Sequence, residues 1–223
     1  MQQTDTPHLP APKPRRGRPR NAPEVSVARQ NLIRAGLEHL TERGYSAVGV
    51  DEILQAVKVT KGSFYHYFGS KADFGLALIA AYDAYFVTLL ERAFACANSS
   101  PLERIRVFAE LAEEGMARHG FRRGCLVGNL GQEMGALPDM FRGALLAVLE
   151  RWQARTATLF AEAQSAGELA DGHDPQALAE MFWIGWEGAV LRAKLELRPD
   201  PLRNFTDTFL HMLGGAPPCL TKG

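Results

Sequence analysis

The sequence predicts an all-α protein, with a three-helix head that contains a helix-turn-helix and a larger helical body behind it. Apolar residues recur at helical spacing along nearly the whole chain, as Val50, Ile53 and Val57 illustrate. Short runs rich in Gly, Pro, Asn and Ser separate these segments. No strand pattern, nucleotide-binding glycine loop or internal repeat stands out. A chain of 223 residues is long enough for one or two domains with a sizeable core.

Charge is distributed unevenly along the chain, although the formal total is zero. Residues 1–75 contain 11 Lys and Arg against 7 Asp and Glu, whereas the remaining residues contain 14 against 18. A basic beginning and an acidic remainder suit a protein that contacts phosphates with one end only.

The composition, with 46% hydrophobic and 22% charged residues, is that of an ordinary globular protein. Cys96, Cys125 and Cys219 are an odd number without a close pair, so neither a disulfide framework nor a zinc site is predicted. The histidines have no recognisable catalytic or metal-binding spacing, so we expect no enzymatic activity, no metal and no cofactor. The N-terminus is Pro- and Arg-rich and no apolar run of membrane-spanning length stands out, which predicts a reduced, cytoplasmic protein.

Residues 1–24 are predicted to form a flexible basic arm, because the six prolines from Pro7 to Pro23 exclude a regular helix. The arginines of this arm are Arg15, Arg16, Arg18 and Arg20. Arginines on an extended Gly-Pro backbone can follow the narrow minor groove of A·T-rich DNA, and the Arg-Gly-Arg-Pro core resembles an AT-hook. The alternative is a solvated basic tail, but beside a helix-turn-helix we favour contact with DNA.

The head is predicted to span residues 25–72. Its first helix runs from Ser26 to Arg43, and Gly44 ends it as a C-cap glycine would. A second helix begins at Val50, and the apolar period breaks before Thr60, where a third helix begins.

The third helix of the head carries a polar surface that indicates contact with DNA. Thr60 is placed to cap this helix by accepting from the backbone N–H of Ser63. The residues expected to contact DNA are Thr60, Lys61, Gly62, Ser63, Tyr65, His66, Tyr67 and Lys71. In helix-turn-helix proteins the second helix of the motif lies in the major groove, with its first residues on base edges and its polar flanks on phosphates.

The same residues carry a resemblance to a known family. The segments Arg43-Gly44-Tyr45, Lys61-Gly62-Ser63-Phe64-Tyr65-His66-Tyr67-Phe68 and Ser70-Lys71 resemble the DNA-binding domain of TetR-type one-component repressors. The resemblance covers about Ser26 to Phe74, and it implies a homodimer on double-stranded operator DNA. It also implies that Lys61, Gly62 and Ser63 meet base edges and that Tyr65, Tyr67 and Lys71 meet phosphates. Asp51 is acidic where some relatives have a cation, so it is assigned no phosphate contact.

Residues 73–213 are predicted to form a helical body for ligand binding and dimerisation, and residues 214–223 a flexible tail. A long helix begins after Lys71 and should connect the head to the body. Later helices are predicted to end near Gly120 and to span 138–167, 176–197 and 202–213. The last two resemble the pair that forms the dimer interface in this family.

Aromatic residues of the body are expected mainly in its core. Those assigned to the core are Phe108, Phe160, Phe182 and Phe209. Trp183 and Trp186 lie three positions apart, so both could pack on the partner subunit or one could reach the edge of a pocket.

The segment from Gly120 to Leu137 is unusual because glycines recur in it at helical spacing. These glycines are Gly124, Gly128, Gly131 and Gly135. If the segment is helical they form one bare stripe, which needs close packing or a ligand beside it, because glycine weakens a helix by about 1 kcal/mol relative to alanine. Cys125, Asn129 and Gln132 would line up beside that stripe.

A ligand pocket is implied by the resemblance, between the long helix after the head and the glycine-rich segment. The candidate ligand-binding residues are Tyr82, Tyr85, Met116, Arg118, Cys125, Asn129, Gln132, Trp152 and Trp186. The segments 121–134 and 183–188 further resemble the acrylate-responsive repressors of dimethylsulfoniopropionate and acrylate metabolism. That resemblance implies release from the operator by acrylate or a similar small unsaturated acid, which would shift the two heads to a spacing that no longer fits the DNA.

Three roles remain open for Cys125. The first is to line the site of a bound carboxylate, which would also need a cation such as Arg118. The Gly-Cys-Leu step also resembles an electrophile-sensing branch of the family, in which a thiol-based sensor needs a partly exposed thiolate whose pKa is lowered by Arg122 or Arg123. The third possibility is a small, buried, unreactive side chain. A purely architectural DNA-binding protein is the other alternative for the chain, but it leaves the body without a role.

Overall fold

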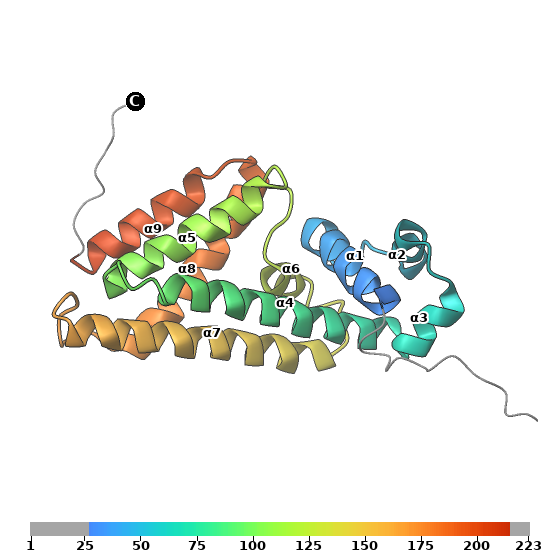
Figure 1. Cartoon of the computed structure of the whole chain (residues 1–223), viewed down its shortest axis with the longest axis horizontal. Helices are drawn as coiled ribbons and strands as arrows, with labels where there is room; N and C mark the ends of the chain where they lie inside the picture. Colours follow the sequence, from blue (N-terminus) through green and yellow to red (C-terminus); the bar gives the residue numbers. More distant parts are fainter. Residues whose placement is uncertain (1–26, 215–223) are drawn as a thin grey trace, which may run out of the picture.

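The computed structural model describes residues 27–214, and every regular element within that range is a helix. The helices are α1 (Val27–Arg43), α2 (Val50–Val57), α3 (Lys61–Tyr67), α4 (Lys71–Phe94), α5 (Pro101–Ala117), α6 (Leu126–Gln132), α7 (Met140–Ser165), α8 (Pro175–Glu196) and α9 (Asp200–Met212) (Figure 1). The all-α prediction is confirmed. The predicted arm with Arg15, Arg16, Arg18 and Arg20 lies outside the described residues, as do residues 215–223 of the predicted tail.

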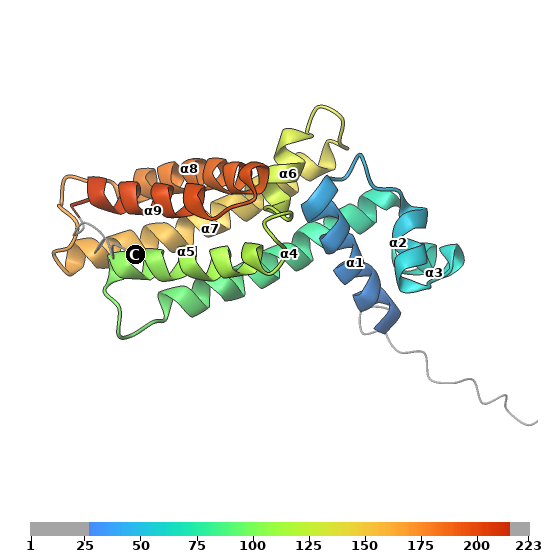
Figure 2. The same ribbon diagram turned by 90° about the horizontal axis from the view of Figure 1, so that it is seen from above.

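Helices α1 to α3 form the head, which lies at one end of the molecule and rests on the first turns of α4 (Figures 1 and 2). Its small core is aromatic. The ring centroids of Phe64 and Phe68 lie 5.2 and 4.8 Å from that of Phe74 in α4. All three side chains are almost fully buried, so the head and the first turns of α4 share one core.

Two predicted helix caps hold the head helices in place. Gly44 adopts a φ of +83°, and its N–H donates to the carbonyl of Leu40 at 3.0 Å, which ends α1. The hydroxyl of Thr60 accepts from the N–H of Ser63 at 3.3 Å, which starts α3. Both capping predictions are confirmed.

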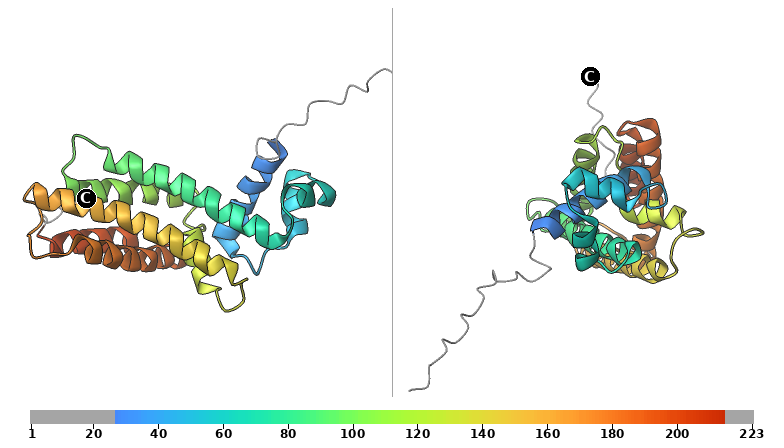
Figure 3. Two further views of the ribbon diagram at one scale, coloured as in Figure 1. Left: turned by 90° about the horizontal axis from the view of Figure 1, so that it is seen from below. Right: turned by 90° about the vertical axis from the view of Figure 1, so that its right-hand side faces the viewer.

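The body is a helical bundle in which α4 and α7 run side by side, with α5, α8 and α9 completing it (Figure 3). Phe108, Phe160, Phe182 and Phe209 are at most 1% exposed, so their assignment to the core is confirmed. Trp183 and Trp186 are each 1% exposed within the single chain. Of the two alternatives for this pair, packing of both on a partner subunit is excluded, because the subunit's own core already covers them.

A carboxylate joins α4 to α7 near the middle of the bundle. Asp83 accepts the indole N–H of Trp152 at 2.9 Å and two N–H groups of Arg151 at 3.0 and 2.7 Å. Because charge-assisted hydrogen bonds are stronger than neutral ones, this contact fixes the register between the two long helices.

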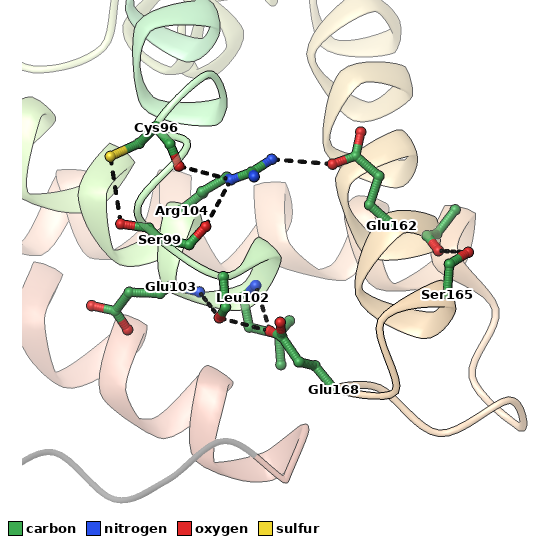
Figure 4. Close-up of polar contacts among 10 residues, drawn as sticks. Cys96, Ser99, Leu102, Glu103, Arg104, Glu162, Ser165 and Glu168 are labelled. Atoms are coloured by element: carbon green, nitrogen blue, oxygen red, sulfur yellow. Dashed lines mark hydrogen bonds and ion pairs between the residues drawn. The ribbon is translucent and has the colours of Figure 1, made fainter.

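The end of the bundle away from the head is held by the side chain of Arg104 (Figure 4). Its Nε donates to the carbonyl oxygens of Cys96 and Ser99 at 3.2 and 3.1 Å, and Nη1 lies 3.2 Å from Glu162 of α7. The turn between α4 and α5 is thereby tied to α7.

Helix α4 differs from one expectation about membrane spans. By length and composition it is the one described helix that could cross a membrane, whereas the sequence analysis predicts no run of that length. Part of its apolar surface packs on α1, α5 and α7 within the bundle.

The glycine-rich segment also differs from expectation, because it is not one continuous helix. Gly124 precedes α6 and Gly135 follows it, so the expected bare stripe is interrupted. Of the two glycines inside α6, Gly128 is the one in close contact. A Cβ built on it would lie 2.1 Å from Oε2 of Glu187, whereas one on Gly131 would meet nothing within 4 Å.

Candidate functional site

The outer surface of α3 presents polar and aromatic side chains to solvent. Lys61, Tyr65 and His66 are exposed, and Tyr65 keeps 48% of its surface accessible. A Cβ built on Gly62 would meet no atom within 4 Å, so the backbone of the first turn is open to close approach. The buried Phe64 fixes the other side of the helix in the head core. Helix α3 therefore offers one rigidly held polar face.

Some residues that are predicted to contact DNA already interact with other side chains of the head. Nζ of Lys61 lies 3.2 Å from a carboxylate oxygen of Asp51, and both side chains are exposed, so the pair is weak and easily exchanged for a phosphate. The hydroxyls of Thr60 and Ser63 lie 3.0 Å apart at the helix cap. Tyr67 is half-buried.

Lys71 lies differently from the prediction that it projects toward phosphates. Its Nζ donates to the carbonyl of Tyr45 at 3.0 Å and lies 4.2 Å from the centroid of the Tyr45 ring. Partial burial lowers the pKa of Lys71, and the nearby Glu133 raises it to a smaller extent. The side chain thus packs under the turn after α1, where a cation–π contact stabilises it.

A cavity of about 810 Å³ opens between α1, α4 and α5, and the segment before α6 and part of α8 close its inner end. Six of the predicted ligand-binding residues line it, namely Tyr82, Tyr85, Met116, Arg118, Cys125 and Trp186. Phe86, Met116, Cys125 and Trp186 are buried and are here called the cavity floor. A volume of this size is typical of sites for small organic ligands.

Three predicted ligand-binding residues do not line this cavity. Asn129 points to the head, where its side-chain N–H group donates to the carbonyls of Leu40 and Thr41 at 3.1 and 2.8 Å. Gln132 is exposed at the end of α6. Trp152 is fully buried in the aromatic core. The alignment of Asn129 and Gln132 beside the pocket rested on a continuous glycine-rich helix, which does not exist.

The sequence interpretation missed that the head contributes one wall of the cavity. Residues of α1 line it, among them Ile33, Leu37 and Thr41. The arginines in the lining, here called the basic rim, are Arg29, Arg34, Arg118 and Arg123. The lining contains a single acid, Glu38, which lies 3.7 Å from Arg123. Helical periodicity could show that α1 is amphipathic, but not that its half-buried apolar positions face a cavity.

The thiol on the cavity floor differs from the expected exposed thiolate. Cys125 is 6% exposed, and its pKa lies well above the ordinary value because of burial and then because of the charge of Glu187. Arg122 is exposed, and Arg123 pairs with Glu38. The exposed thiolate with a lowered pKa that the electrophile-sensing alternative requires is therefore not present, and the thiol is buried as in the third alternative.

Glu187 of α8 is a further feature of the site that the sequence interpretation missed. Burial raises its pKa to about 7, although a hydrogen bond with Cys125 acts in the opposite direction. Tyr82, whose pKa is also raised well above its usual value by burial, lies within hydrogen-bonding reach of the same thiol. A signal was present in the sequence, because Glu187 is a lone acid between Trp186 and Gly188 on an otherwise apolar stretch.

Helix α6 connects the cavity floor to the head. The N–H of Gly124, next to Cys125, donates to the carbonyl of Thr41 at 3.0 Å. At the other end of α6, the carboxylate of Glu133 accepts the N–H groups of Tyr45 and Ser46 at 2.9 and 2.8 Å. Both ends of α6 therefore hold the C-terminal end of α1 and the turn that follows it.

Similarity to known proteins agrees with this architecture. Residues 32–78 match the bacterial regulatory proteins of the tetR family, and residues 101–209 match the tetracyclin repressor-like C-terminal domain. The chain is 72% identical over 209 residues to the transcriptional regulator AcuR of Cereibacter sphaeroides, which covers 94% of this chain and 95% of that protein. The crystal structure of regulatory protein TetR from Rhodobacter sphaeroides matches with a TM-score of 0.82 at 73% identity, over 83% of this chain and 98% of that one. The reduced form of Escherichia coli NemR matches with a TM-score of 0.74 at 27% identity, over 86% and 100%. The chain belongs to the TetR family of transcriptional regulators.

Proposed function

We propose that this protein is a repressor that binds operator DNA as a homodimer and is released by a small effector, acrylate or a similar unsaturated acid. The observation that carries the proposal is the cavity of about 810 Å³, whose walls come from the head helix α1 as well as from the body. A ligand in that position contacts the DNA-binding part directly. We place the protein in the cytoplasm with its DNA and assign it no enzymatic activity, because its relatives are named as transcriptional regulators.

Contact with DNA is assigned to α3 and to the basic arm. The exposed Tyr65, the open backbone at Gly62 and the exchangeable pair of Lys61 support a helix that lies in the major groove. Lys71 is better regarded as a support for the turn at Tyr45 than as a first contact with phosphate. The arginines of the arm add sequence-independent affinity for the DNA backbone.

The dimer interface is assigned to α8 and α9, because apolar side chains gather on their outer faces. Of the eleven large hydrophobic side chains that are exposed on the described chain, six lie on these helices or at the end of α8: Met181, Ile184, Leu191, Leu195, Leu197 and Met212. Exposed apolar surface of this extent typically marks an interface. The partner subunit supplies the second α3 that a palindromic operator requires.

Replacing Ile184 with Glu tests this interface. Ile184 is 70% exposed, so the change should be tolerated in the monomer but should prevent the burial of an apolar seam against the partner. We expect sedimentation to show a monomer and operator affinity to fall by at least about tenfold. The matched control is Leu146→Glu on α7, where the leucine is 53% exposed but lies outside the proposed interface. A stable dimer in Ile184→Glu would contradict the assignment.

The basic rim favours an effector with a negative charge. Four arginines against one glutamate in the lining give the cavity an excess of positive charge, and the apolar floor suits the carbon end of the ligand. A small unsaturated acid would therefore lie with its carboxylate toward Arg118 and its double bond toward Cys125.

Transmission to the head is assigned to α1 and α6. The cavity lining includes both Thr41 and Cys125, and the Thr41 carbonyl is hydrogen-bonded by Gly124 beside that cysteine. A ligand that favours a different position of this segment moves the end of α1 and, with it, the spacing of the two heads.

A gel-shift titration with the protein's own operator tests the effector. We expect acrylate to release the wild-type protein, and Arg118→Ala to need at least about tenfold more acrylate because a charge-assisted contact is lost. Operator affinity without acrylate should be unchanged, since Arg118 lies on the body side of the cavity. Arg142→Ala, on the exposed surface of α7, is the control. Equal sensitivity of the two variants would contradict the placement of the carboxylate.

A second candidate function is a thiol-based sensor of electrophiles or oxidants that uses Cys125. The observation that favours it is the position of this cysteine on the floor of the cavity. Because acrylate is itself a weak Michael acceptor, the two functions overlap. If acrylate still releases Cys125→Ala from the operator, the effector binds reversibly and the covalent sensor is excluded.

A further inference from the structure

Glu187 is a half-buried acid with one carboxylate oxygen, Oε1, that is fully enclosed and has no hydrogen-bond partner among the described residues. A buried carboxylate oxygen without a partner is expensive, and native proteins rarely keep one without a reason. The residue lies on α8 directly after Trp186, which is part of the cavity floor.

The position of this carboxylate depends on the glycine at the facing site in α6. A Cβ on Gly128 would lie 2.1 Å from Oε2 of Glu187 and 3.8 Å from Cβ of Cys125. No side chain larger than hydrogen therefore fits between the carboxylate and the helix. The glycine at this site brings the acid against the first turn of α6, beside the thiol.

The thiol lies between this acid and the cavity. Cys125 and Tyr82 line the cavity, and Glu187 does not. The Cys125 thiol is within hydrogen-bonding reach of both Glu187 and the Tyr82 hydroxyl. Cys125 is therefore accessible from the cavity and at the same time adjoins an acid that is not part of the cavity lining.

We propose that Glu187 accepts the proton of the Cys125 thiol and thereby makes this thiol a site for addition to α,β-unsaturated carbonyl compounds. The inference rests on the second candidate function, to which it adds a proton acceptor and a substrate class.

The addition proceeds without any oxidant or other co-reactant. The S–H bond of Cys125 breaks and its proton passes to the Glu187 carboxylate, while Sγ forms a bond to the β-carbon of the ligand. The electron pair of the carbon–carbon double bond moves toward the carbonyl, and the α-carbon then takes up the proton. The net result is a thioether with every atom of thiol and ligand retained.

A proton acceptor is needed here because the thiolate is not formed in advance. Burial raises the pKa of Cys125 well above its usual value, so a free thiolate is scarce at neutral pH. The pKa of Glu187 is about 7, which leaves part of the population ionised and able to take a proton. The titratable groups that face Glu187 are Cys125, before α6, and Tyr82, on α4.

The basic rim sets the direction in which an unsaturated acid enters. An ionised Glu187 repels a carboxylate from the cavity floor, whereas Arg118 and the other arginines of the rim attract it. The carbon–carbon double bond is thus turned toward Sγ. The rim therefore favours ligands with a carboxylate, and the thiol reacts only with those that also carry a conjugated double bond.

The rate of addition of acrylamide to the purified full-length protein tests the proposal. Acrylamide is uncharged, so the rate reports on the thiol and its proton acceptor and not on the rim. Peptide mass spectrometry assigns the adduct to Cys125 and separates it from Cys96 and Cys219. The variants are Glu187→Gln, which keeps the size of the side chain, Glu187→Asp, which keeps the acid, and Cys125→Ser as the blank.

We expect Glu187→Gln to react at least about tenfold more slowly than the wild type near neutral pH. The wild-type rate should level off as Glu187 becomes ionised, whereas the rate of Glu187→Gln should keep rising into the alkaline range, because it follows the thiol alone. The rate of addition in Glu187→Asp should lie between those of the wild type and Glu187→Gln. If circular dichroism shows that the Gln variant is misfolded, the comparison of Glu187→Asp with the wild type replaces it.

Two results would overturn the inference, namely no Cys125 adduct in the wild type, or the same rate and pH profile in wild type and Glu187→Gln. Neither result bears on operator release by acrylate, which the gel-shift titration measures separately. An adduct without release would leave the inference in place and contradict the proposed effector.

Discussion

Two glutamates flank α6, and the structure surrounds them in opposite ways. Glu133 follows the last residue of the helix, and both of its carboxylate oxygens accept backbone N–H groups of the head, from Tyr45 and Ser46. Glu187 approaches the first turn from α8, and its Oε1 is buried without a partner among the described residues. The two residues are similarly half-buried as a whole, but both oxygens of Glu133 are paired, whereas one oxygen of Glu187 is buried and unpaired within residues 27–214.

The difference separates a contact that holds the fold from one that is available for chemistry. A carboxylate whose two oxygens both accept backbone N–H groups is well held in place, so Glu133 is suited to fix the turn after α1. An enclosed carboxylate beside a thiol gains a great deal from a proton, so Glu187 is suited to exchange one. Because α6 is a single short helix, a change at the Glu187 end reaches the Glu133 end without crossing a flexible segment.

The largest expected effect is on the pH dependence of stability, through Glu187. Its pKa is about 7 in the folded chain against an ordinary value of 4.5, so the folded state keeps a proton that the unfolded state loses. The stabilisation from this proton is present below about pH 4.5 and is lost as pH rises to about 7, by up to about 3 kcal/mol. Glu187→Gln carries no titrating group. The free energy of unfolding in urea should therefore fall less between about pH 5 and about pH 8 in this variant than in the wild type.

Glu150→Gln, at an exposed position of α7, is the control for that measurement and should follow the wild type. Parallel curves for wild type and Glu187→Gln would mean that the Glu187 carboxylate is solvated, and the contrast with Glu133 would then disappear.

A smaller effect is expected from removing the paired carboxylate. Glu133→Ala leaves the N–H groups of Tyr45 and Ser46 without their acceptor, which should lower the free energy of unfolding by about 2 kcal/mol because the site is partly exposed. Amide hydrogen exchange at these two residues should become faster, and operator affinity should fall as the head loses its fixed orientation. Glu150→Ala is the matched control. Unchanged exchange at Tyr45 and Ser46 would show that Gly44 alone holds the turn.

The head was predictable from the sequence because its signals are local. Three signals each depend on residues a few positions apart: the N-cap formed by Thr60, the C-cap formed by Gly44, and the apolar spacing in α2. The extents of the long body helices followed from the same periodicity. Lys71 was the exception, because its partner Tyr45 lies 26 positions away in the sequence, and no local pattern indicates that a lysine folds inward.

The candidate site was predicted only in part, because it depends on which distant residues meet. Tyr82, Cys125 and Trp186 do line one cavity, as the family resemblance implied. The wall from α1 could not be predicted, since it follows from the way distant helices pack. Glu187 left a signal as a lone acid in an apolar stretch, but the sequence could not show that it meets Cys125. Asn129 was placed on the correct helix but in the wrong role, because a side chain that hydrogen-bonds the head cannot also face the ligand.

The smallest expected effect distinguishes two glycines of α6 that look alike in the sequence. Gly131→Ala meets nothing within 4 Å and should stabilise the helix by up to about 1 kcal/mol, as alanine generally does in a helix. Gly128→Ala would place a methyl group 2.1 Å from Oε2 of Glu187, so the carboxylate must move away from the thiol. We expect Gly128→Ala to show no stabilisation of the helix and to lower the free energy of unfolding by about 1 kcal/mol. It should also react more slowly with acrylamide at Cys125. Urea unfolding and the addition rate measure the two effects, and equal behaviour of the two alanine variants would mean that Glu187 does not depend on the space at Gly128.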